Sequence, residues 1–210
     1  MIGFKAYGCH GSIEDLSAKM ETGSIYYLYN HANGFENLFN DDEDHELFLS
    51  KVIKHTAGIA EYYSFCLMPN HFHFLLRIKP EEEITPTMIG RKIEKKISRS
   101  FASAFSGFTQ KFNRKYSRIG SLFKPNMKSR PVMDELDFCK TAHYIHANPV
   151  HHGFVQNILD WKYSSYRMIL ENEVSWLNVK TVFDHFGDVH EFVKYHRQPI
   201  DLKIKEKAYF

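Results

Sequence analysis

Two histidines lie one residue apart in the segment MPNHFHFLLRIKP, residues 68–80, inside an otherwise apolar run. Side chains alternate between the two faces of a strand, so His71 and His73 share one face while Phe72 and Phe74 share the other. Two imidazoles on one rigid strand can bind the same divalent cation. The alternative is a pair of surface or hydrogen-bonded histidines in a chain that has 13 of them. Two nitrogens alone do not complete a metal site, so the metal-binding interpretation requires a third ligand.

A second candidate group lies in DELDFCKTAHYIHANPV, residues 134–150. On a helix, Lys140, Tyr144 and Asn148 are spaced by four residues and therefore share one polar face. The apolar residues of the same helix form a separate stripe for the core, Phe138, Ala142 and Ile145. A phenol can act as a nucleophile that forms a covalent intermediate, and an amide oxygen can complete a metal site. The pattern is also compatible with an ordinary tyrosine followed by a helix stop at Pro149.

Strands are predicted where β-branched and aromatic residues cluster, at residues 24–31, 62–68 and 71–78. Pro69 and Asn70 are turn residues between the last two of these strands, so we expect those strands to form an antiparallel pair. The stretch from residue 116 to 132 contains Gly and Pro breakers and is typical of a loop or short strands.

Helices are predicted between and after the strands, at residues 45–59, at 87–115, from about Asp134 to Asn148, and within 175–187 and 189–197. The second of these is expected to begin with Thr85 as N-cap and Pro86 in the first turn. Pro149 is expected to stop the helix that carries Tyr144. The order of elements favours an α+β fold, a small antiparallel sheet with flanking helices that cover one face. We expect one catalytic domain over residues 1–170 and a helical C-terminal extension over 171–210.

The composition, 43% hydrophobic and 25% charged, is that of a soluble globular protein. No apolar run approaches the roughly 18 residues of a membrane span, so we expect no membrane partner. The N-terminal residues MIGFKAYGCHGSIEDL do not form the pattern of a secretory signal. Three widely separated cysteines with no CxxC pair argue against a disulfide framework and favour the cytoplasm.

A net charge of only +2 conceals two oppositely charged segments, an acidic one at residues 36–46 and a basic one at residues 91–130. Cations bind phosphates, and the interleaved aromatics Phe112, Tyr116 and Phe123 offer stacking to unpaired bases. For residues 91–99 a solvated helix face is an equal alternative. The predicted DNA-binding residues are Arg114, Lys115, Arg118, Lys124, Lys128, Arg130 and Lys140.

Taken together, these segments resemble the single-tyrosine HUH transposases, which include the REP-associated tyrosine transposases. The resemblance spans roughly residues 24–168 and rests on the segments YYLYNH, MPNHFHFLL, GSLFKPNMKSRPV, HYIHANPVHHGFV and WKYSSY. It implies the fold of the family, a small sheet with flanking helices that forms the ferredoxin-like palm of HUH nucleases.

The resemblance also implies roles for individual residues. The metal-binding histidines of the family correspond to His71 and His73, and its nucleophile corresponds to Tyr144. The further metal ligand corresponds to Asn148, where insertion-sequence members often have Gln. The implied enzyme uses a divalent metal, Mg²⁺ or Mn²⁺, and no nucleotide cofactor. It cleaves and rejoins single-stranded, hairpin-bearing DNA through a 5′-phosphotyrosine link, and a homodimer is an expected assembly.

Two other functions are compatible with the same residues. A domesticated DNA- or RNA-binding regulator could keep the fold without cutting, although the intact set of His71, His73, Tyr144 and Asn148 argues against a decayed site. A replication initiator or relaxase would use the same chemistry on another substrate. Such proteins usually have additional domains, for which we expect no room in 210 residues.

Overall fold

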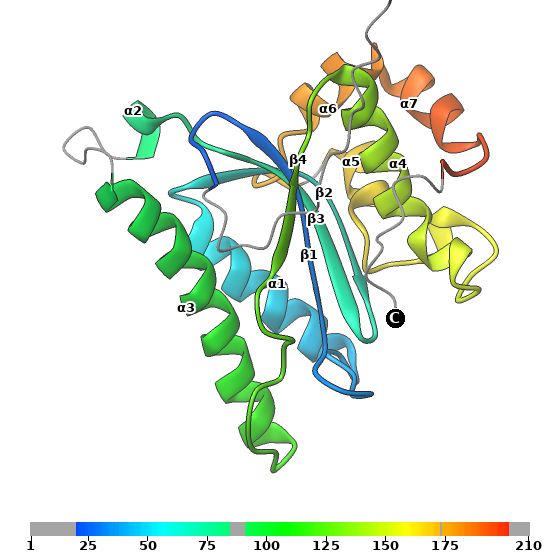
Figure 1. The fold of residues 1–210 in the computed structure, drawn as a ribbon. Coiled ribbons are helices and arrows are strands. Elements are labelled where there is room, and N and C mark those ends of the chain that lie inside the picture. Colours follow the sequence, from blue (N-terminus) through cyan, green and yellow to red (C-terminus); the bar gives the residue numbers. More distant parts are fainter. Residues whose placement is uncertain (1–19, 85–90, 173, 202–210) are drawn as a thin grey trace, which may run out of the picture.

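The computed structural model describes residues 20–84, 91–172 and 174–201 of the chain. Its sheet has the strand order β2-β3-β1-β4 and antiparallel pairing throughout. Figure 1 shows its strands, β1 (Ile25–His31), β2 (Ala60–Met68), β3 (His71–Ile78) and β4 (Lys128–Pro131). The three predicted strands are confirmed, and the β2–β3 turn lies at the predicted Pro69 and Asn70. The short β4 lies inside the stretch from 116 to 132 and pairs with β1.

One face of the sheet is covered by the helices α1 (Asp42–Thr56) and α3 (Arg91–Lys115) (Figure 1). The ring of Phe48 on α1 lies 5.0 Å from that of Phe72 and 6.3 Å from that of Phe74. Phe105 on α3 lies 5.5 Å from Phe72. The phenylalanine face of β3 therefore packs under helices, as the alternation of the strand predicts.

The opposite face is covered by α4 (Glu135–His151), so helices lie on both faces of the sheet rather than on one. The ring of Phe138 lies 5.4 Å from Tyr63 of β2, and the ring of Tyr144 lies 6.0 Å from His73 of β3. The second layer is needed because β1 and β3 carry large side chains on both faces. Neighbouring residues such as Tyr27 and Leu28 point to opposite faces, yet both are buried.

The boundaries of α4 differ from the prediction at one end only. Asp134 is the N-cap, and its carboxylate accepts a hydrogen bond from the Asp137 backbone N–H at 2.8 Å. Pro149 does not stop the helix, which continues to His151. A proline in the last turn removes only one backbone donor, and the His152 N–H still bonds to the Asn148 carbonyl at 3.0 Å.

The remaining described elements are short and helical: α2 (Glu81–Ile84), the 3₁₀ turn η1 (Ile158–Asp160), α5 (Ser165–Glu171), α6 (Val179–Phe186) and α7 (Val189–His196). The helices predicted within 175–187 and 189–197 are confirmed. The expected helix start at Thr85 and Pro86 and the first cysteine, Cys9, lie outside the described residues. The two cysteines inside them are buried and free.

The edge of β2 is covered by the chain that follows α4. Trp161 donates its indole N–H to the Leu67 carbonyl at 3.1 Å, and the Leu67 N–H bonds to the Tyr163 carbonyl at 2.9 Å. Further along the edge, the Asn178 N–H bonds to the Tyr62 carbonyl at 2.9 Å. These contacts satisfy backbone groups that an open edge would leave exposed. None of the described helices is long and apolar enough to span a membrane.

Candidate active site

Both histidines of β3 face α4, and the pairing of β3 with β1 adds a third. His71 is opposite His31, and His73 is opposite Tyr29. The His71 ring lies 4.8 Å from the His73 ring and 5.0 Å from the His31 ring. From α4, Asn148 reaches the same place, with its Oδ1 at 3.3 Å from Nε2 of His71. The two histidines and the amide that the sequence singles out therefore converge.

Each histidine of β3 is held through its Nδ1. His71 donates its Nδ1–H to the Oδ1 of Asn70 at 2.7 Å, and Nδ1 of His73 lies 2.8 Å from the hydroxyl of Tyr27. The Nε2 atoms are left for the site, and Nε2 of His73 is buried with no hydrogen bond among the described residues. Partners on the far nitrogen are a usual feature of metal-binding histidines, because they fix the tautomer and the ring orientation.

Burial keeps both imidazoles neutral. It lowers the pKa of His71 to about 3, helped by the nearby His31 and His152 and opposed by the amide oxygen of Asn148, which faces the ring and favours its charged form. Burial also lowers the pKa of His73 well below its ordinary value. A metal ion binds the neutral form of imidazole, so the site presents its nitrogens in the state that coordination requires.

The donor set fits a divalent cation. No three His, Cys, Asp or Glu side chains within residues 20–84, 91–172 and 174–201 come together as a metal site, so the third protein donor would be the amide oxygen of Asn148. With Nδ1 of His71 donating, its Nε2 presents a lone pair to the Asn148 oxygen. Two lone pairs at this separation repel, and a cation beside them would remove the repulsion.

Tyr144 lies one helical turn before Asn148 on α4 and adjoins His73. Its ring meets His73 edge-on at 6.0 Å and Tyr27 edge-on at 6.2 Å. The side chain is only 2% exposed, rather than part of an open polar helix face. Reaction with a DNA phosphate would therefore require the phenol to be uncovered.

Several of the predicted DNA-binding cations are engaged by carboxylates of the protein. Lys115 contacts Asp41 and Asp44 at 2.8 and 3.0 Å, and Arg118 forms an ion pair with Glu36. The acidic segment thus neutralises part of the basic one.

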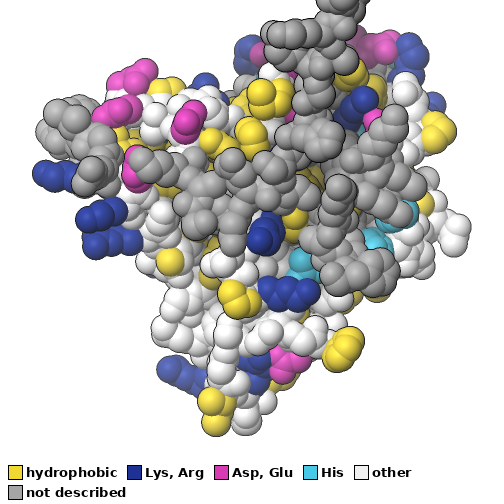
Figure 2. Space-filling view, in the orientation of Figure 1, with side chains coloured by type: hydrophobic (Ala, Val, Ile, Leu, Met, Phe, Trp, Pro, Cys, Tyr) yellow, Lys and Arg dark blue, Asp and Glu magenta, His cyan; other side chains and the backbone are white. Residues whose placement is uncertain are grey.

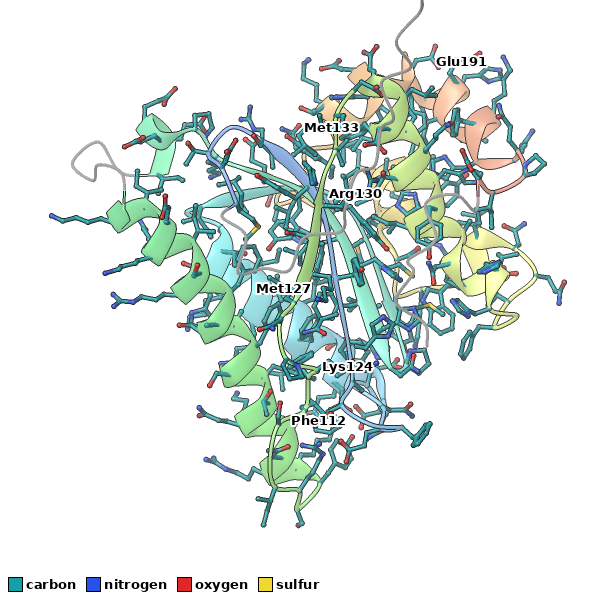
Figure 3. All side chains as sticks on the ribbon, viewed as in Figure 1. Phe112, Lys124, Met127, Arg130, Met133 and Glu191 are labelled. Atoms are coloured by element: carbon teal, nitrogen blue, oxygen red, sulfur yellow. The ribbon has the colours of Figure 1, made fainter. Side chains whose placement is uncertain are left out.

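Four of the other five predicted cations fall into two groups. Arg130 pairs with Asp137 at 2.7 Å, and Lys140 pairs with Asp201 at 3.0 Å. In contrast, Arg114 and Lys124 are exposed and form no ion pair within the described part of the chain. Figure 3 shows Lys124 and Arg130 along the segment that leads into α4, with Lys128 in β4 between them in sequence.

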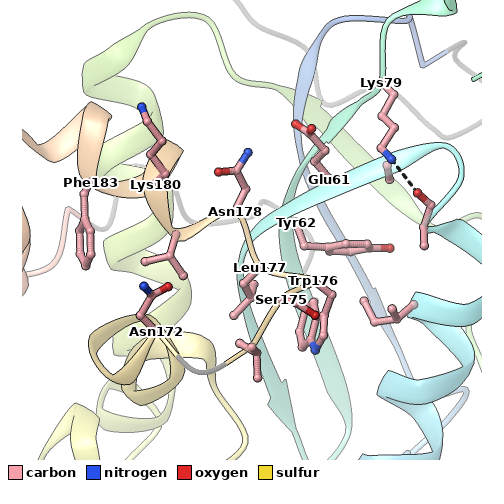
Figure 4. Close-up of a pocket in the computed structure, with 15 residues that line it drawn as sticks. Glu61, Tyr62, Lys79, Asn172, Ser175, Trp176, Leu177, Asn178, Lys180 and Phe183 are labelled. Carbon is pink, nitrogen blue, oxygen red and sulfur yellow. Dashed lines mark hydrogen bonds between the residues drawn. The ribbon is translucent and has the colours of Figure 1, made fainter. Parts of the chain in front are cut away.

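A pocket of about 910 Å³ lies elsewhere, between the start of β2 and the segment after α5 (Figure 4). It is lined by Tyr62, Trp176 and Lys180 among others and contains none of the candidate catalytic residues. Its cations are engaged, because Lys79 donates to the Ala57 carbonyl at 2.8 Å and Lys180 pairs with Asp184. The pocket is therefore separate from the histidine site.

Comparisons with known proteins bear on the family and the fold. No family model matches the sequence. A protein of Haemophilus influenzae, named as a REP-associated tyrosine transposase, is 24% identical over 155 residues, which are 70% of this chain and 76% of that protein. A solved structure of a REP-associated tyrosine transposase bound to a REP hairpin superposes with a TM-score of 0.52 at 14% identity. It covers 85% of this chain and 90% of that one. The chain is therefore similar to REP-associated tyrosine transposases, in sequence to one and in fold to another.

This similarity confirms the predicted resemblance, and the shared fold confirms the α+β architecture. Sequence reasoning missed three groups around the site, Tyr27, His31 and Asn70. His152 also lies there, with its ring 5.5 Å from that of His71. Alternation in YYLYNH does place Tyr27, Tyr29 and His31 on one face. Only the register shows that this face is the one with His71 and His73.

Proposed function

We propose that this protein is a metal-dependent DNA strand transferase that cleaves and rejoins single-stranded, hairpin-bearing DNA through Tyr144. The observation that carries the proposal is the convergence of His71, His73, Asn148 and Tyr144 on one face of the sheet. The relatives support it, since one of them is a transposase whose solved structure contains a REP hairpin.

A divalent cation would be held by Nε2 of His71, Nε2 of His73 and Oδ1 of Asn148. When bound, it would supply Lewis-acid polarisation of the scissile phosphodiester and offset the negative charge that develops there. Mg²⁺ prefers oxygen donors, and two imidazoles also suit Mn²⁺. The protein's own contribution is orientation, because Asn70 and Tyr27 hold the far nitrogens of the two rings.

The tyrosine would perform the covalent step. The Tyr144 oxygen forms a bond to phosphorus as the bond from phosphorus to the 3′ oxygen breaks. The phenol loses its proton, and the leaving oxygen gains one to become a 3′-hydroxyl. The 5′ end of the DNA stays on the protein as a phosphotyrosine, which keeps the ester bond for the reverse attack. Rejoining therefore needs no nucleotide cofactor.

A non-cleaving DNA- or RNA-binding regulator is the second candidate. The observation that favours it is the 2% exposure of Tyr144, because a buried phenol cannot meet a phosphate without a rearrangement. The two candidates differ in one measurable product, a covalent complex between protein and DNA.

The deciding experiment incubates the full-length protein with single-stranded DNA hairpins and Mg²⁺ or Mn²⁺, followed by denaturing electrophoresis. We expect a denaturation-resistant adduct with the wild type and none with Tyr144→Phe. Tyr166→Phe, a buried tyrosine on α5, is the matched control and should form adduct normally. An adduct that persists in Tyr144→Phe would exclude this nucleophile. Wild-type protein that binds every hairpin and links to none would favour the regulator.

A further inference from the structure

Two large apolar side chains protrude into solvent on neighbouring loops. Phe35 is 109% exposed and Ile119 is 94% exposed, the highest values among the large hydrophobic side chains of the described residues. Figure 2 shows hydrophobic side chains standing out at the lower end of the molecule beside lysines and arginines. Single exposed apolar residues are common on protein surfaces. These two differ because hydrogen bonds and an ion pair hold together the two loops that carry them.

These interactions join one loop to the other. Arg118 donates its Nε–H to both carboxylate oxygens of Glu36 at 2.9 Å and reaches the Ser121 carbonyl at 2.8 Å. A backbone bond of 2.8 Å joins the Asn33 N–H to the Leu122 carbonyl. The positions of Phe35 and Ile119 are therefore linked through their neighbours in sequence.

Each protruding residue also adjoins a glycine in a left-handed turn. Gly34, before Phe35, has a φ of +66°, and Gly120, after Ile119, has a φ of +94°. Few other residues adopt such angles without strain. The backbone that carries the phenyl ring is thus held in a tight turn, so little backbone freedom is lost when a ligand contacts the ring.

Phe35 and Ile119 lie at the same end of the sheet as the candidate active site. Phe35 follows His31 by four residues, a span of at most about 14 Å, and the His31 ring lies 5.0 Å from that of His71. Between them, the Lys124 N–H bonds to the His31 carbonyl at 2.9 Å. The Lys124 side chain is exposed and forms no ion pair in the described part of the chain (Figure 3).

We propose that Phe35 is a stacking platform for an unpaired base of the DNA strand that leaves the candidate active site. Ile119 flanks the base, and Lys124 contacts the backbone phosphate beside it. An aromatic face accepts any base, so this contact adds affinity without requiring a particular sequence, and a cation close by matches the charge of the strand. The inference rests on the single-stranded DNA substrate of the proposed function but not on cleavage.

The test compares two fluorescein-labelled probes of equal length and phosphate charge, an oligothymidylate and a fully abasic oligomer. We expect Phe35→Ala to raise the Kd for oligothymidylate at least about fivefold and to change the Kd for the abasic oligomer less than about twofold. Phe35→Trp should restore the difference, because it restores an aromatic face. Met133→Ala is the matched control, since Met133 is 77% exposed and lies at the far end of β4 from Lys124 (Figure 3).

If Phe35→Ala raises the Kd for both probes equally, or changes neither Kd, the proposal is overturned. A changed sedimentation coefficient of Phe35→Ala with unchanged DNA binding also overturns it and assigns the pair to a contact with a second copy of the chain. The binding measurements need neither metal nor Tyr144, so they can be repeated in a Tyr144→Phe background. If binding depends on the base through Phe35 while the wild-type protein forms no adduct, the stacking surface is supported and the cleavage is excluded. If the wild type forms an adduct while Phe35→Ala leaves both Kd values unchanged, the cleavage is supported and the stacking surface is excluded.

Discussion

Nε2 of His71 on β3 lies 3.3 Å from Oδ1 of Asn148 on α4, a contact between residues 77 positions apart in the chain. It connects the histidine strand to the helix that carries Tyr144. The positions of the predicted ligands and of the predicted nucleophile are therefore coupled, and changes at Asn148 should alter metal binding most directly.

Asn148→Asp should bind Mn²⁺ at least about tenfold more tightly than the wild type, because a carboxylate adds a full negative charge next to the cation. Isothermal titration calorimetry of the metal-free protein measures the effect. Asn148→Leu has a similar size and no donor, so it should lose binding. Equal Mn²⁺ affinity in the two variants would show that residue 148 is not a ligand.

Tyr27→Phe should weaken Mn²⁺ binding by about 10- to 100-fold, the usual cost of removing a partner from the far nitrogen of a ligand histidine. The lost hydroxyl lies 2.8 Å from Nδ1 of His73. Tyr29→Phe is the control, because its ring stacks on Tyr27 at 5.2 Å and its hydroxyl makes no bond to His73. The prediction fails if both phenylalanine variants bind Mn²⁺ alike.

Lys124→Gln should reduce the salt dependence of single-stranded DNA binding, lowering the slope of log K against log salt by about 0.7, the value for one phosphate contact. Lys115→Gln should keep the wild-type slope and instead lower Tm, because Lys115 already contacts Asp41, Glu43 and Asp44. Anisotropy titrations over a salt series and thermal melts distinguish the two. A reduced slope in Lys115→Gln alone would reverse the assignment.

A buried hydrogen-bonded chain connects α7 to α4, α5 and β2. His196 donates its Nδ1–H to the Phe192 carbonyl at 2.8 Å and accepts the Nδ1–H of His146 at 2.9 Å. Nε2 of His146 accepts the hydroxyl of Ser165 at 2.7 Å, and Ser165 accepts the Phe65 N–H at 2.8 Å. Both imidazoles are neutral in this chain, because each has one donating and one accepting nitrogen.

Acid should destabilise the fold through this chain. Burial lowers the pKa of His196 from 6.5 to about 3. Below pH 6.5 the unfolded chain binds a proton that the folded chain does not, so stability falls as the pH drops toward 3. The expected loss from one such group is about 1.4 kcal/mol per pH unit. Urea unfolding between about pH 6 and pH 4 should show a shallower pH dependence for His196→Gln.

Ser165→Ala is the control for that measurement. It breaks the same chain without removing a titrating group, so it should cost about 1–3 kcal/mol at every pH and keep the wild-type pH dependence. If His196→Gln retains the wild-type pH dependence, His196 does not carry this part of the acid sensitivity.

Local patterns in the sequence predicted the longer elements and the faces on which the candidate residues lie. Alternation predicted the strand of His71 and His73 and the opposite orientation of Phe72. Capping chemistry predicted the start of α4 at Asp134, and spacing by four predicted that Tyr144 and Asn148 share a face. These features depend on neighbours within a few residues, which the sequence states directly.

Only the tertiary structure decided what those faces meet. The strand register brings His31 and Tyr27 to the histidines of β3, and a shift by one residue would turn them to the opposite face. In the folded chain Tyr144 is buried. The acidic segment forms ion pairs with Lys115 and Arg118, which composition alone suggested were available for DNA. Such contacts join residues far apart in the chain, so they depend on how the whole sheet pairs and packs.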